Sequence, residues 1–398
     1  MKKILYISII SALFFSTQVL ASLKNTNPND SIDISLLTCS PGDEIYSLFG
    51  HTAIRYQDRK HGIDIVFNYG MFSFQTPHFL WRFILGETDY QLGVTDYQNF
   101  ATEYEYYGRG VKEQILNLSK EEKNKLFTSL KRNYLPENRV YRYNFFFDNC
   151  ATRPRNMIEN CINGEIKYAT SPVAISFRDI IHKYTAKHPW ERFGIDLCLG
   201  VKADKPISNR AEMFAPEYLY KSFASASIVN ITKEKRKLVF SSKELIHQRS
   251  IKAPIHNNIP TPLQSFLLVF IITTSLTIYE LKNKKNYWII DLCLFSAAGI
   301  AGCIIAFLAV FSVHPTVSPN YLLFVLHPLH ILALPFLIYT AKNKRKNWYH
   351  IVNLAVLTLF ILLWGVIPQR FDFAILPLAL SLLIRSASNI ILAYKKHK

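Results

Sequence analysis

Two regions with different hydrophobic patterns follow one another along the chain. Up to about residue 260, short runs in which apolar and polar residues alternate are separated by Gly, Pro, Asn and Asp, as in β-strands joined by turns. Helical segments interrupt these runs, so this region is predicted to be an α+β domain. The predicted strands are 32–39, 50–56, 63–69, 89–95, 104–118 and 141–147, and the predicted helices are 119–134 and 151–162.

Beyond about residue 262 the pattern changes to long apolar blocks. Each block is close to the roughly 20 residues that an α-helix needs to cross a bilayer. We therefore predict an all-α membrane domain of five transmembrane helices over residues 259–398. The five blocks are 262–280, 287–311, 320–341, 348–367 and 372–394.

The N-terminus has the pattern of a secretory signal. Lys2 and Lys3 precede an apolar run over residues 4–15, and the small residues typical of a cleavage site end at Ala21. The apolar run is too short to span a bilayer of ~30 Å comfortably. We predict a signal peptide over residues 1–21 and an exported domain over residues 22–258.

The charges of the membrane loops predict an orientation. Ten Lys and Arg residues follow the first and third apolar blocks and the last one, whereas the other connections contain only Arg370. Basic loops face the cytoplasm. We therefore expect the C-terminus in the cytoplasm and residues 22–258 in the periplasm of a bacterial inner membrane. Of the net charge of +17, +9 lies after residue 258, so nucleic acid is not an expected partner.

The junction at Cys150 has the composition of a nucleophilic site. A predicted strand runs into Asp148-Asn149-Cys150, and a predicted helix follows. Backbone N–H groups and the positive end of the helix dipole favour a thiolate at such a position and can stabilise an oxyanion. Disulfides are permitted in an exported domain, so the alternative is that Cys150 is half of a disulfide or a core residue.

A thiol nucleophile needs a nearby imidazole, and His51 is the candidate base. Asp64 and Asn68, on the strand that returns from His51, are candidates for orienting its ring, and the strand pattern does not decide between them. Asp196 and Asp204 are weaker alternatives.

Other residues are candidates for substrate binding. Arg153 and Arg155, close after Cys150, can hold a phosphate headgroup or can be solvated charges of a helix. His327 and His330 lie within the third apolar block, where ionisable groups are costly and often functional. No His and Cys pair has the spacing of metal ligands, and no metal or cofactor is expected.

Four segments contain long and specific runs of residues. They are Leu36 to Gly42, Phe49 to Arg55, Phe67-Asn68-Tyr69-Gly70 and Tyr143 to Arg155. Together they resemble the Bacteroides-type lipoprotein N-acyltransferase (Lnb) family, which also joins an exported domain to a helical membrane domain. The order of His51 before Asn149-Cys150 is similar to that of the permuted papain-like proteins that resemble lecithin retinol acyltransferase.

The resemblance implies an activity and two substrates. A fatty acyl chain would pass from a membrane phospholipid, through a thioester on Cys150 with His51 as base, to the α-amino group of the diacylglyceryl-Cys of exported lipoproteins. A thioester keeps enough transfer potential to acylate an amine, and ping-pong kinetics follow. Two alternatives are a membrane-anchored Cys hydrolase of cell-wall peptide and a non-enzymatic envelope assembly module.

Overall fold

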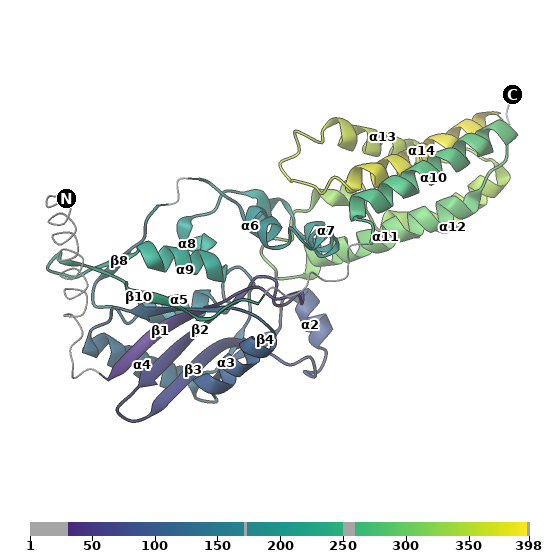
Figure 1. Ribbon diagram of the computed structural model, residues 1–398. Helices are drawn as coiled ribbons and strands as arrows, with labels where there is room; N and C mark the ends of the chain where they lie inside the picture. Colours follow the sequence, from purple (N-terminus) through teal and green to yellow (C-terminus); the bar gives the residue numbers. More distant parts are fainter. Residues whose placement is uncertain (1–30, 171–172, 250–258, 396–398) are drawn as a thin grey trace, which may run out of the picture.

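The computed structural model describes residues 31–170, 173–249 and 259–395. An α+β domain comes first, and a bundle of long helices extends from one side of it to the C-terminal end of the described chain (Figure 1). This arrangement confirms the predicted fold class. The predicted signal peptide over residues 1–21 lies outside the described residues.

A seven-stranded antiparallel sheet forms the framework of the N-terminal domain. The strand order is β10-β5-β1-β2-β3-β4-β6, so the predicted strand at 32–39 lies in the middle of the sheet beside the predicted hairpin. The strands are β1 Ile32–Cys39, β2 His51–Asp58, β3 Ile63–Met71, β4 Asp89–Asp96, β5 Val111–Leu116, β6 Val140–Arg142 and β10 Val239–Ile246. A second sheet contains β7 Glu165–Lys167, β8 Ser227–Val229 and β9 Lys235–Lys237 in the order β7-β8-β9.

Short helices pack around the main sheet. The helix predicted at 119–134 is present as α4 Lys120–Tyr134, and it begins with a capping box in which the Ser119 and Glu122 side chains bond each other's backbone N–H groups. The other helices of this domain are α2 Phe79–Leu85, α3 Tyr97–Tyr106, α5 Thr152–Glu159, α6 Phe177–Tyr184, α7 Pro189–Cys198, the 3₁₀ turn η1 Val201–Asp204, α8 Asn209–Glu212 and α9 Pro216–Ser225.

Two segments differ from the predicted elements. The predicted strand at 104–118 begins in α3, because Phe100, Ala101 and Tyr104 have helical spacing and are buried together against the sheet. Only its second half forms a strand, β5. The predicted strand at 141–147 ends with β6 at Arg142, and a turn closed by the backbone of Asn144 and Asp148 follows.

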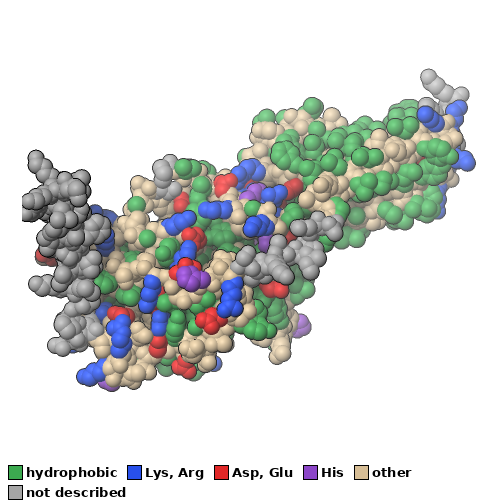
Figure 2. Space-filling model, viewed as in Figure 1, with side chains coloured by type: hydrophobic (Ala, Val, Ile, Leu, Met, Phe, Trp, Pro, Cys, Tyr) green, Lys and Arg blue, Asp and Glu red, His purple; other side chains and the backbone are tan. Residues whose placement is uncertain are grey.

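The helices of the C-terminal bundle match the five predicted blocks in number. Four spans are long and apolar enough to cross a membrane, and the remaining helix, α13, has 15 residues. Figure 2 shows hydrophobic side chains over the side of the bundle and Lys and Arg side chains at the end farthest from the N-terminal domain. The helices are α10 Pro262–Asn283, α11 Trp288–Phe311, α12 Leu329–Asn343, α13 Trp348–Leu362 and α14 Ile375–Lys395, and a 3₁₀ turn, η3 Tyr321–Phe324, precedes α12.

The interior of the bundle contains a cluster of paired charges where α10 ends and α11 begins. Arg385 of α14 is fully buried and bonds Glu280 of α10 and Asp291 of α11, and its Nε lies 2.6 Å from an oxygen of Asp291. Thr277, Ser388 and Asn389 complete the bonds of the three charged groups. Buried charges are tolerated when they are paired in this way.

The α+β domain is held on the bundle by α7 and η1. Phe193 of α7 packs against Phe266 of α10, and Trp190 donates to the backbone oxygen of Pro260 at 2.9 Å. On the bundle side, the Gln369 amide donates to the backbone oxygen of Leu199 at 3.1 Å. These contacts fix one end of the bundle against the domain.

Candidate active site

Cys150 lies in the turn before α5, one residue ahead of the N-cap residue Ala151. Asn149 holds this turn, because its Oδ1 accepts the N–H groups of Ala151 at 2.8 Å and Thr152 at 2.9 Å, and its amide nitrogen donates to two backbone carbonyls. Asn149 therefore caps the helix in place of the sulfur. The thiol is left free to face the sheet.

The sheet brings His51 to the same place. His51 is the first residue of β2, and Gly70 lies near the end of β3 with a φ of +92°. A Cβ built on Gly70 would lie 3.5 Å from the Cβ of Cys150 and 4.0 Å from the Cε1 of His51. The thiol and the imidazole thus flank one glycine, whose missing side chain leaves the space between the sheet and the turn before α5.

Asn68 bonds the His51 ring, and Asp64 does not reach it. Nε2 of His51 lies 2.5 Å from Oδ1 of Asn68. Because an amide oxygen only accepts, this contact requires a proton on Nε2 and leaves the lone pair of the neutral ring on Nδ1. Asp64 pairs in register with Gln57, which lies six residues after His51 on β2. Six strand residues span about 20 Å, so Asp64 lies that far from His51. Its carboxylate binds Arg55 at 2.5 and 2.7 Å.

Desolvation keeps the Cys150 thiol and the His51 imidazole uncharged at neutral pH. It raises the pKa of the Cys150 thiol to about 11, although the N–H groups of Thr52 and Cys150 point at the sulfur and favour its charged form. It lowers the pKa of His51 to about 4, against the opposing effect of the Asn68 hydrogen bond. The helix start at Cys150 was expected to favour a thiolate. Desolvation of the thiol outweighs that effect here, and the thiol lies outside the cap.

A positive charge and several rings surround this pair. Arg109 favours the charged form of Cys150 and disfavours that of His51, and its Nε donates to the backbone oxygen of Ser40 at 3.0 Å. The stacked rings of Tyr90 and Tyr143, 4.1 Å apart, lie close enough to Cys150 for a charge on its sulfur to raise the pKa of both phenols. Sequence reasoning did not single these residues out for the site. Apart from the position of Tyr143 seven residues before Cys150, no spacing in the sequence relates them to Cys150.

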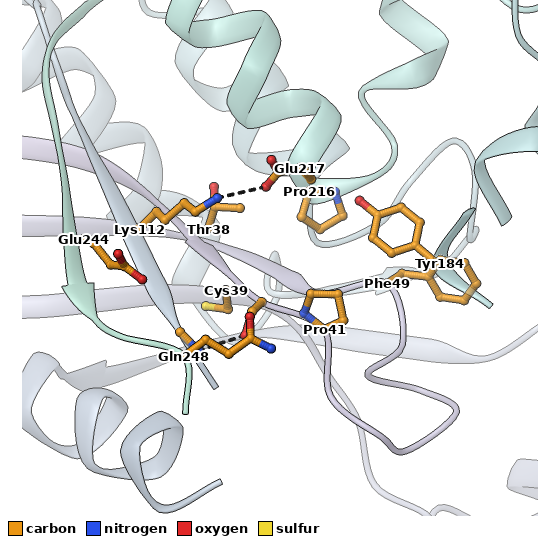
Figure 3. Close-up of a pocket in the computed structure, with 12 residues that line it drawn as sticks. Thr38, Cys39, Pro41, Phe49, Lys112, Tyr184, Pro216, Glu217, Glu244 and Gln248 are labelled. Carbon is orange, nitrogen blue, oxygen red and sulfur yellow. Dashed lines mark hydrogen bonds and ion pairs between the residues drawn. The ribbon is translucent and has the colours of Figure 1, made fainter. Parts of the chain in front are cut away.

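A cavity of about 240 Å³ lies near His51, on the side of the sheet where β1 ends. It is lined by the end of β1, by β5 and by the start of α9, and Lys112 and Glu217 form an ion pair of 3.5 Å beside it (Figure 3). Cys39 is on its wall and lies directly opposite His51 in the pairing of β1 with β2. Cys150 and His51 are not among its lining residues.

Arg153 and Arg155 are engaged with the protein. Arg153 forms a bidentate ion pair with Asp148, at 2.6 and 2.7 Å, and its guanidinium lies 3.6 Å from the centre of the Tyr141 ring. Arg155 is buried and donates to the backbone oxygen of Arg210 at 2.7 Å. Both side chains brace the turn that contains Cys150.

The two histidines of the bundle lie at a break in the third predicted span. His327 precedes Pro328, and α12 begins only at Leu329, so His330 lies in its first turn. The two rings are stacked 3.8 Å apart. His330 is fully buried and bonds Tyr349 at 2.7 Å and the backbone oxygen of Val325 at 3.0 Å.

The remaining candidates lie elsewhere. Asp196 and Asp204 both bind the buried Arg178, and Asp204 also binds Arg370, at the contact between the α+β domain and the bundle. All six cysteines are free thiols. Within the described ranges, no group of three or more His, Cys, Asp and Glu residues is arranged to hold a metal ion.

An α+β domain with a half-buried Cys and His pair, joined to a bundle of membrane-spanning length, defines a membrane-anchored protein with a thiol site. Residues 20–186 match the family model of the Lnb N-terminal periplasmic domain, and residues 254–397 match that of the Lnb transmembrane domain. The chain belongs to the Lnb family, which implies a lipoprotein N-acyltransferase-like function and lipoprotein substrates. Comparison with curated proteins and with solved structures gives no match.

Proposed function

We propose that this chain transfers a fatty acyl group from a membrane phospholipid, through a thioester on Cys150, to the α-amino group of the N-terminal diacylglyceryl-Cys of lipoproteins. Membership of the Lnb family supports the overall reaction. The observation that carries the chemistry is the position of the Cys150 thiol and the His51 imidazole on either side of Gly70. Asn68 is the positioning residue for the imidazole in this proposal.

The first half-reaction forms the thioester. Nδ1 of His51 takes the proton of the thiol as the Cys150 sulfur attacks the ester carbonyl, and the N–H groups of Thr52 and Cys150 face the developing negative charge. When the intermediate collapses, the carbon–oxygen bond of the ester breaks. The leaving oxygen takes the proton from His51, and lysophospholipid is released.

The second half-reaction uses the same pair. The lipoprotein amine attacks the thioester carbonyl, its proton moves to His51, and the carbon–sulfur bond breaks to leave an amide. The proton returns to the sulfur of Cys150. His51 is uncharged at neutral pH, so its imidazole can accept a proton at the start of each half-reaction and pass it on at the end.

The proposal includes the arrangement in the membrane. We infer that residues 22–258 lie in the periplasm, and that residues 259–398 cross the inner membrane with the C-terminus in the cytoplasm. Two observations support this orientation. Basic side chains gather at the end of the bundle farthest from the α+β domain, and basic loops face the cytoplasm. The family name assigns the N-terminal domain to the periplasm.

The two alternative functions predict different behaviour. A cell-wall peptide hydrolase would use the same pair but would release fragments from purified peptidoglycan. An assembly module in which Cys150 is half of a disulfide is disfavoured by its free thiol. No observation of the site favours either over acyl transfer.

The test is transfer from a phospholipid with a labelled acyl chain to a synthetic diacylated lipopeptide, with the full-length protein in vesicles. Cys150→Ser should abolish transfer, with a loss of at least about 10³-fold, because an alcohol is a much weaker nucleophile here. Cys198→Ser, at another half-buried thiol, is the matched control and should transfer normally. Transfer by Cys150→Ser at the wild-type rate would refute the proposal.

A further inference from the structure

Helix α2 is apolar and yet exposed. Its sequence is Phe-Leu-Trp-Arg-Phe-Ile-Leu, and none of its residues is buried. Leu80 is 70% exposed, Trp81 54% and Phe83 46%. Phe74 and Tyr46, which contact each other beside α2, are 67% and 61% exposed. These five residues form a contiguous apolar patch, here called the α2 patch, of the kind that marks a binding surface.

The α2 patch lies where a membrane-spanning helix ends. The N–H of Val313, just after α11, donates to the backbone oxygen of Leu85 at 2.9 Å, and the Trp81 ring lies 5.1 Å from that of Phe307 within α11. Phe311, at the end of α11, is 62% exposed. Figure 1 shows α2 beside the end of α11 that faces the α+β domain. The exposed side of the span and the α2 patch are therefore one continuous apolar surface.

Aromatic rings connect the α2 patch to the reacting pair. Phe72 contacts Phe74 at 5.0 Å and Phe79 of α2 at 5.6 Å between ring centres, and it stacks on Tyr90 at 4.9 Å. Tyr90 in turn stacks on Tyr143 at 4.1 Å. Phe72 is only two residues from Gly70, which Cys150 and His51 flank.

We propose that α2 inserts into the outer surface of the bilayer and that Phe72, Tyr90 and Tyr143 guide the acyl chain of a phospholipid from the bilayer to Cys150. The occupant is a lipid because the α2 patch continues the exposed surface of α11, which must face hydrocarbon once it spans the membrane. The chain then stays against these aromatic side chains between the bilayer and Cys150. This inference rests on the proposed function, since it names the binding path of its acyl donor.

The double variant Leu80→Glu/Trp81→Glu tests the path in full-length protein. The rate at which Cys150 is labelled is compared for two acyl donors. One is a phospholipid in vesicles of phosphatidylethanolamine and phosphatidylglycerol, and the other is a short-chain p-nitrophenyl ester in solution. The variant should label at least tenfold more slowly from the vesicles and within twofold of wild type from the soluble ester. Ile231→Glu, at a 95% exposed residue between β8 and β9, should change neither rate.

Equal rates from the vesicles for the double variant and wild type would overturn the inference. Loss of labelling in the wild type with both donors would instead refute the proposed function.

A second measurement does not depend on activity or on the charged variant. The fluorescence of Trp81 is obtained as the difference between wild type and Trp81→Phe, and it should be quenched in vesicles of brominated phospholipid. An unquenched Trp81 would also overturn the inference. That result is expected if α2 binds a protein instead.

Discussion

The ion cluster around Arg385 in the bundle is fully buried, whereas Cys150 and His51 in the periplasmic domain are half-buried, and the two sites contain different kinds of polar group. Arg385 is paired with two carboxylates, and each of the three charges has further hydrogen bonds. Cys150 and His51 are uncharged at neutral pH, and their environment contains no carboxylate bound to the imidazole. In the ion cluster, every charge is paired, and the pairs hold α10, α11 and α14 together. Cys150 and His51 are neutral, so a proton can move between the thiol and the imidazole.

Removing the base should have the largest effect. His51→Ala should lower the rate of Cys150 acylation by about 10²- to 10⁴-fold, because it removes the imidazole that lies beside the thiol. Its thermal unfolding temperature should stay close to that of wild type, since the variant removes a polar group and no core contact. His61→Ala, in the exposed turn between β2 and β3, is the matched control. A normal acylation rate in His51→Ala would show that the pair is not the reacting centre.

Breaking the ion cluster should act on stability instead. Arg385→Ala leaves Glu280 and Asp291 buried without their partner, which should destabilise the bundle by about 3–5 kcal/mol. Thermal unfolding of the full-length protein in detergent micelles measures this. Arg345→Ala, at an exposed residue that follows α12, is the control and should unfold like wild type. A stable Arg385→Ala protein with a lowered rate per folded molecule would mean that the cluster takes part in catalysis.

A smaller change distinguishes the two candidates for orienting His51. With a base of pKa about 4, acylation of Cys150 should be independent of pH near neutrality and should fall as the pH drops through about 4, where the imidazole becomes protonated. Asn68→Asp places a carboxylate beside the His51 ring, which favours the protonated imidazole. The midpoint should therefore move upward by about one pH unit or more.

Asp64→Asn is the matched comparison and should leave the midpoint near 4, because Asp64 binds Arg55. The pH profile of a single acylation step, with the soluble ester as donor, avoids the titration of the lipoprotein amine. A shift with Asp64→Asn and none with Asn68→Asp would reverse the assignment.

Local patterns predicted the elements that hold the site. The strand at 32–39, the hairpin that begins at His51 and the helix capped by Ser119 all depend on neighbouring residues, and the structure contains each of them. The segment at 104–118 was misassigned because its tyrosines favour a strand, whereas packing of Phe100 and Tyr104 against the sheet makes its first part a helix.

The chemistry of the site depends on contacts that the positions of the residues in the sequence do not predict. Asp64 and Asn68 lie on the same face of β3, so alternation was unable to separate them, and only the strand register shows how far Asp64 lies from His51. The burial that raises the pKa of Cys150 depends on how the chain packs around the thiol, where Tyr90 of β4 and Tyr143 are among its neighbours. The break at His327 in the third predicted span was likewise hidden, because the residues on both sides are apolar.

The most direct test of the account is the mass of the peptide that contains Cys150 after the full-length protein is mixed with phospholipid vesicles without lipoprotein. The account predicts a mass increase equal to one acyl group on Cys150, reversed by hydroxylamine at neutral pH and lost when a diacylated lipopeptide is added. An unmodified Cys150 in protein that still acylates the lipopeptide, or the acyl group on another residue, would contradict it.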